Sequence, residues 1–121
     1  MTSEREELLA LLDELNQAIT NAAEALSASR ADNRRFRQLI AKGTPLRDAL
    51  SVVSAPESRA SVEVALKHMA RTRHQLRRMV LALGMNEGMS LAEVGRLYGI
   101  SRQLASRLVA EAREDGEYVP S

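Results

Sequence analysis

The 121-residue chain has no cysteine and no tryptophan, and aromatic residues make up only 2% of it. Without cysteine it forms no disulfide and offers no thiolate ligand to a metal ion. With so few aromatic residues, a hydrophobic core must be built from Leu, Val, Ala, Met and Ile. The same scarcity gives little support to a small-molecule sensor in the segment 36–66.

Residues that break helices are also scarce, with three prolines and six glycines, whereas Ala and Leu are abundant. This composition favours an all-α fold of one or two small domains. No uninterrupted apolar run reaches the length of a membrane span. The acidic N-terminus lacks the basic and apolar regions of a signal peptide. We therefore expect a cytoplasmic protein that does not enter a membrane.

The net charge of +1 conceals an uneven distribution along the chain. Residues 1–29 contain six acidic and one basic side chain, whereas residues 30–121 contain 10 acidic and 16 basic ones. Between Lys67 and Arg107, eight basic residues stand against two acidic ones. A basic surface attracts nucleic-acid phosphates without reading the sequence, whereas an acidic helix is repelled by them.

Patterns typical of catalytic or metal sites are missing from the sequence. His68 and His74 are six residues apart, so they do not share a helix face as metal ligands four apart would. The serines lack a glycine elbow with a matching histidine, and no glycine-rich phosphate loop occurs. We expect no enzyme activity, no cofactor and no metal site.

The periodicity predicts six helices separated by capping and breaking residues. Thr44 as N-cap with Pro45 at the first position opens the third helix, Ser54 with Glu57 opens the fourth, and Gly84 ends it. The expected ranges are about 3–29, 32–43, 45–53, 54–83, 90–98 and 101–114. Gly116 to Ser121 are expected to form a frayed tail.

Three arginines lie at the expected start of the second helix, where the helix dipole disfavours cations by about 0.3–1 kcal/mol each. They are Arg34, Arg35 and Arg37. This conflict is compatible with a second phosphate contact. A solvated cluster, or pairing with the acidic first helix, is the favoured interpretation.

The first and fourth helices carry apolar residues that alternate three and four apart, as in coiled coils. In the first helix this row is Leu8, Leu12, Leu15, Ile19, Ala22 and Leu26. In the fourth it is Val62, Ala65, Met69, Thr72, Leu76, Met79 and Leu83. Such rows must pack on another helix, of the same chain or of a second copy, and we favour a homodimer. The candidate dimer or packing residues are Leu8, Leu12, Leu15, Ile19, Leu26, Val62 and Met69.

Residues 90–109 have the form of two short helices joined by a tight turn. Ser90 with Glu93 provides a capping box for the first of them. Gly99 suits the left-handed position that ends a helix, Ile100 would fill the corner, and Ser101 caps the second helix. In the first helix, Leu91, Val94 and Leu97 are expected to face a core. Gly95 is expected where the two helices approach most closely, so that a side chain there would push them apart.

In the second short helix, Leu104, Ala105 and Leu108 form an inward row, and polar residues occupy the other face. Arginine pairs with guanine, and glutamine with adenine, in the major groove of DNA. We therefore expect this face to read DNA bases. The alternative is that it is the solvated side of an amphipathic helix. The candidate base-reading residues are Ser101, Arg102, Gln103, Ser106 and Arg107.

The segment GISRQLASRLV, residues 99–109, resembles the turn and recognition helix of lactose-repressor-type regulators. Residues 89–107 also resemble region four of bacterial sigma factors and related tri-helical DNA-binding domains. The likeness covers about residues 77–113. It implies base-reading positions for Arg102, Gln103 and Arg107, with Ser101 and Ser106 beside them. These families usually have alanine where Gly95 stands and a larger aliphatic residue where Ala105 stands.

These patterns predict three regions: a helical dimerisation or interaction region at 1–72, a helix-turn-helix domain at 73–115, and a tail at 116–121. The long N-terminal and central helices should form a coiled-coil-like bundle. The end of the fourth helix, residues 73–83, should serve as the first helix of a tri-helical unit without a wing. The candidate phosphate contacts are Ser90, Arg71, Arg77, Arg78 and Arg96.

The sequence therefore predicts a sequence-specific DNA-binding protein, a homodimeric bacterial transcription regulator that binds double-stranded DNA through residues 101–114. One alternative is an adaptor that binds a regulator or sigma factor through the acidic helix 3–29. Another is an accessory factor of the nucleoid or of DNA recombination.

Overall fold

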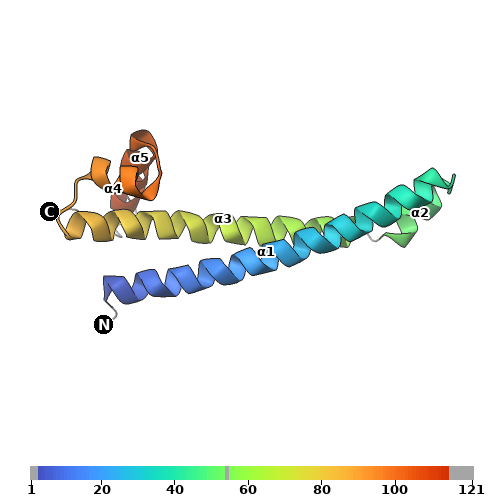
Figure 1. The fold of residues 1–121 in the computed structure, drawn as a ribbon, viewed down its shortest axis with the longest axis horizontal. Coiled ribbons are helices and arrows are strands. Elements are labelled where there is room, and N and C mark those ends of the chain that lie inside the picture. The colour runs from blue at the N-terminus through green and yellow to red at the C-terminus, as the bar shows by residue number, and fades with distance from the viewer. Residues whose placement is uncertain (1–2, 54, 115–121) are drawn as a thin grey trace. The chain divides into compact units, whose positions relative to one another are not determined.

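The computed structural model describes residues 3–53 and 55–114, and these residues form an all-α fold without strands (Figure 1). Their five helices are α1 (Glu4–Ala41), α2 (Leu46–Val52), α3 (Ala55–Asn86), α4 (Leu91–Tyr98) and α5 (Arg102–Glu114). Among the described residues, no helix is both long and apolar enough to cross a membrane. The predicted tail, 116–121, lies outside the described residues, as does most of the segment that a wing would occupy.

The fold divides into two units. The described part of unit 1 comprises residues 3–14 and 72–114, which are the start of α1, the second half of α3, and α4 and α5. Unit 2 comprises residues 15–71, which are the rest of α1, α2 and the first half of α3. One boundary, at Thr72, falls where the expected DNA-binding domain begins, but the first turns of α1 belong to the same unit as α4 and α5.

The prediction of separate helices at 3–29 and 32–43 is wrong, because α1 runs without a break from Glu4 to Ala41. The chain contains no glycine or proline before Gly43, so nothing interrupts the hydrogen bonding at Asp32. Arg34, Arg35 and Arg37 therefore lie inside a continuous helix, before its last turn, which contains no basic residue. The electrostatic conflict expected there does not exist.

Two other helix ends differ from the prediction. The N-cap of α2 is Pro45 and not Thr44, and no side chain caps this helix. Helix α3 continues through Gly84 to Asn86 instead of ending at Leu83, because the positive φ that turns the chain is at Gly88. The capping box predicted at Ser54 cannot be described, because that residue lies outside the described set.

Small residues line the inner side of α1 in unit 2. Ala18 and Ala22 are buried, and Leu15 and Ala25 are half-buried. On α3, three members of the predicted apolar row in unit 2 are half-buried: Val62, Ala65 and Met69. Small side chains let two helix backbones approach closely, so the inner row of α1 is rich in alanine.

The heptad seam predicted for α1 consists of two rows of residues, which differ in exposure. Leu8 and Leu15 are half-buried and belong to the inner row with Ala22. The other three lie on the flank of that row and remain exposed: Leu12 at 39%, Ile19 at 46% and Leu26 at 48%.

Unit 1 is held by one apolar cluster that joins α3, α4 and α5. Its buried members are Leu81, Val94, Ala105, Leu108 and Val109. Val80, Met85, Met89, Leu91, Ile100 and Leu104 pack around them. The start of α1 is attached at the surface of the same unit. There Asn86 Nδ2 donates to Glu4 Oε1 at 2.7 Å, and the Arg5 guanidinium pairs with the Glu87 carboxylate.

Close packing in this cluster depends on Gly84, which is buried within α3. A Cβ atom built there would lie 2.5 Å from Cγ2 of Val94, well inside contact distance. The close approach expected at Gly95 is much looser, with the nearest atoms at 3.4 Å (Ile100 O) and 3.6 Å (Ala105 Cβ). The expectation that a side chain at Gly95 would force the helices apart is therefore wrong.

We predict opposite effects for the same substitution at these two glycines. Gly84→Ala should lower the free energy of unfolding, because overpacking costs about 1–3 kcal/mol and Val94 is stiff at χ1. Gly95→Ala, the matched control, should leave stability unchanged or raise it by up to about 1 kcal/mol through helix propensity. Chemical denaturation measures both, and equal effects would contradict the close contact between Gly84 and Val94.

Candidate nucleic-acid interface

Helix α4 is fixed at both ends by its own sequence. Ser90 Oγ accepts a hydrogen bond from the Glu93 amide at 3.1 Å, as the capping pattern predicts. Gly99 has φ +85°, and the amides of Gly99 and Ile100 both donate to the Gly95 carbonyl, at 3.0 and 2.9 Å. This left-handed backbone conformation favours glycine, since a residue with a Cβ atom would be strained in it. The turn therefore ends α4 and redirects the chain into α5.

Helix α5 begins with a second side-chain cap. Ser101 Oγ accepts a hydrogen bond from the Leu104 amide at 3.1 Å. One face of the helix is then anchored in the apolar cluster, with Ala105, Leu108 and Val109 buried and Leu104 half-buried. The inward row predicted from the sequence is confirmed. Because the helix is held at its start and along this face, its opposite face has a defined orientation within unit 1.

The opposite face of α5 is polar and exposed. All five predicted base-reading residues lie there with exposed side chains: Ser101, Arg102, Gln103, Ser106 and Arg107. Exposed Ala110 continues this face one turn further on, so no large side chain stands in front of Gln103 and Ser106. The face thus presents two guanidinium groups, one amide and hydroxyls on a helix of 13 residues, about 20 Å long.

Glu111 of α5 contacts a residue of α3. His74 Nε2 lies 2.8 Å from Glu111 Oε2, so the carboxylate of α5 is engaged with α3. Sequence reasoning missed this contact because the two residues are 37 positions apart and no local spacing indicates it. The pair also contributes to seating α5 on α3, through side chains that are about 40% exposed.

The predicted phosphate contacts are only partly brought together. Ser90 and Arg96 are exposed on α4, in the same unit as α5, and Arg77 is half-buried on α3. Arg71 is exposed but belongs to unit 2. Because the other residues in this set are in unit 1, the structure groups Arg71 separately from them.

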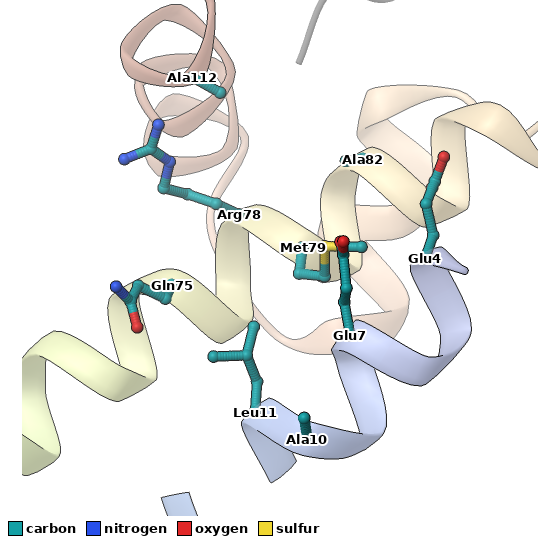
Figure 2. Close-up of a pocket in the computed structure, with 9 residues that line it drawn as sticks. All are labelled: Glu4, Glu7, Ala10, Leu11, Gln75, Arg78, Met79, Ala82 and Ala112. Carbon is teal, nitrogen blue, oxygen red and sulfur yellow. The ribbon is translucent and has the colours of Figure 1, made fainter. Parts of the chain in front are cut away.

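The side chain of Arg78 lies at the junction of α3 and α5 (Figure 2). Its half-buried side chain extends from α3 toward α5, where Ala112 lies (Figure 2). It lines an open cavity of about 450 Å³ together with Glu4 and Glu7 of α1. Glutamates of the acidic N-terminal segment therefore share this cavity with an arginine of α3.

One residue predicted for the core of α4 is instead on its surface. Leu97 is 70% exposed, whereas Val94 is buried and Leu91 is half-buried. The inward sector of this eight-residue helix is formed by positions 91, 94 and 95, and Leu97 lies beyond its edge. Together with Tyr98, 40% exposed, it lines a groove of about 270 Å³ that also includes Leu8 of α1.

Unit 2 also contains a cavity, of about 360 Å³, lined by Phe36, Leu50, Val53, Arg59 and Val62 among others. Most of its lining residues belong to the segment 36–66 that was considered for small-molecule binding. Its lining also includes the charged side chain of Asp32, opposite in sign to that of Arg59.

Comparisons with protein-family models, with curated proteins and with solved structures found no match for this chain. The candidate interface is therefore defined by the residues and geometry of the chain itself.

The cap at the start of α5 has a measurable contribution. Ser101→Ala should lower the free energy of unfolding by about 1 kcal/mol, because the Leu104 amide loses its acceptor. Ser106→Ala, on the exposed face of the same helix, should be neutral or slightly stabilising, since alanine is the better helix former. Thermal and denaturant unfolding of the two variants provides the comparison. A loss of stability at Ser106 as large as that at Ser101 would argue against the cap.

Proposed function

We propose that this chain is a sequence-specific DNA-binding protein that inserts α5 into the major groove. In this proposal the protein is a dimeric bacterial transcription regulator, which acts in the cytoplasm on the DNA of the nucleoid. The observation that carries it is the two-sided character of α5. Its polar residues Arg102, Gln103 and Arg107 are all exposed, whereas its apolar residues are buried against α3 and α4.

The chemistry of the exposed face supports base reading. Arg102 and Arg107 each provide a guanidinium that can bind the O6 and N7 atoms of guanine, and the Gln103 amide suits adenine. The major groove, about 12 Å wide, admits one α-helix. Ser90 and Arg96 lie at the ends of α4, where they can contact phosphates and fix the orientation of α5. A unit this small buries little surface on DNA, so tight operator binding requires two copies.

Selection of bound sequences from random oligonucleotides tests the proposal. We expect a defined motif to be enriched. Arg102→Ala or Gln103→Ala should weaken binding to this motif by about 1–3 kcal/mol, which is roughly 5- to 150-fold, and relax the preference at one base position. Fluorescence anisotropy with the selected duplex and with single-base variants measures both effects.

Arg59→Ala is the matched control, because Arg59 is an exposed arginine of unit 2 and the proposal gives it no contact with DNA. It should retain both affinity and preference. The assignment of α5 as the reading helix fails if the Arg102→Ala/Gln103→Ala double variant discriminates operators as the wild type does. It fails equally if no sequence is enriched.

Phosphate contacts have a different signature. The logarithm of the binding constant should fall with the logarithm of salt concentration, by about 0.9 for each phosphate contacted. Arg96→Ala should reduce this slope by about one contact and weaken all duplexes alike. Titrations at several salt concentrations, on selected and unrelated duplexes, distinguish this from base reading. A loss confined to the selected duplex would assign Arg96 to base recognition instead.

A protein-binding adaptor is the second candidate, and one observation favours it. Leu97 is 70% exposed beside a groove lined by apolar residues, and DNA binding does not require an exposed leucine. Under this alternative the selection enriches no motif, and residual DNA binding is insensitive to substitution of Gln103. The same experiment therefore separates the two functions.

A further inference from the structure

One face of α1 carries large apolar side chains that its own chain does not cover. Leu12, Ile19 and Leu26 are 39%, 46% and 48% exposed, and they follow one another at intervals of seven residues. This spacing places them in a single row along the helix. Leucine lies equally far on either side of the central isoleucine, so the row reads the same in both directions.

Charge along α1 is also arranged about this centre. The first part of the helix, residues 4–14, contains five acidic side chains and one basic one. The part from Arg30 to Arg37 contains four basic side chains and one acidic one. The segment between Leu15 and Ser29 contains one charged residue, Glu24. The helix is thus acidic at one end, basic at the other and nearly uncharged between them.

We propose that α1 pairs in antiparallel orientation with α1 of a second copy of this chain, with the two-fold axis at Ile19. Leu12 of one copy then lies opposite Leu26 of the other, and Ile19 lies opposite itself. The acidic segment 4–14 of each copy lies beside the basic segment 30–37 of its mate. A two-fold interface uses the same patch on both subunits, which this symmetric row provides.

The charges select this orientation over the parallel one. In a parallel pair the acidic ends would lie together and so would the basic ends, and like charges at close range repel. The inference deepens the homodimer included in the proposed function by assigning its surface and symmetry. Its test uses no DNA, so failure of the pairing and failure of DNA binding are observed in separate experiments.

Disulfide crosslinking tests the orientation, because the chain contains no cysteine of its own. Ile19→Cys should form a covalent dimer under mild oxidation, since the two copies of this position meet at the axis. Leu12→Cys and Leu26→Cys should each remain uncrosslinked, because equivalent positions lie about 21 Å apart along the helix. The double variant Leu12→Cys/Leu26→Cys should crosslink, as each position then faces the other. Non-reducing electrophoresis shows all four results.

A parallel pair would give covalent dimers with every one of these variants and would overturn the proposed orientation. Sedimentation equilibrium then tests the surface itself. Wild-type chain should be dimeric, and Ile19→Glu should be monomeric with an unchanged helical circular-dichroism spectrum, because two carboxylates would face each other at the axis. Val64→Glu is the control, since Val64 is a 68% exposed apolar residue of α3 outside the row, and it should remain dimeric.

A monomeric wild type, or a dimeric Ile19→Glu variant, overturns the proposal. Should Ile19→Glu unfold, the cysteine variants still test it, because they replace exposed side chains with a small neutral one. If Ile19→Cys then forms no covalent dimer, the two-fold axis does not lie at this position.

Discussion

The missing side chain at Gly84 is the constraint on which unit 1 depends. Val94 occupies the space that a Cβ atom would fill, and this contact brings α4 against α3. Leu81 lies in the same buried cluster, which continues into Ala105 and Leu108 of α5. A larger residue at position 84 would move α4, and α5 would move with it because the two helices share one core. The orientation of the exposed polar face therefore depends on a glycine of another helix, α3.

The position of α5 depends on two separate contributions, local sequence features and long-range packing. The caps at Ser90 and Ser101 and the left-handed turn at Gly99 are short-range features, and they fix where α4 and α5 begin and end. They do not determine how the helix pair lies on α3. That depends on Gly84 and on contacts between distant residues, such as His74 with Glu111. Helices α4 and α5 can thus be predicted from the sequence, but the way they pack on α3 cannot.

This division explains how far the sequence could be interpreted. The all-α class, the caps of the last two helices and the inward row of α5 were predictable, because helical periodicity and capping act within a few residues. The continuity of α1 was not, because Asp32 is a good capping residue and only the absence of a breaker before Gly43 argues against a boundary. The burial of Gly84 and the exposure of Leu97 depend on which helix lies next to them. Periodicity alone does not contain that information.

Helix α1 shows how one sequence can carry two packing surfaces. Its inner row, with Ala18 and Ala22, uses small side chains, which permit close approach within the chain. Its outer row uses Leu12, Ile19 and Leu26, whose larger apolar areas gain more from burial, at about 25 cal/mol per Å². The fully buried residues of α1 are thus alanines, whereas Leu12, Ile19 and Leu26 stay exposed, which reverses the usual distribution of apolar residues. Such a reversal has a physical explanation if the outer row is itself covered, and the opposite charges at the two ends of α1 make its own antiparallel mate the partner that fits.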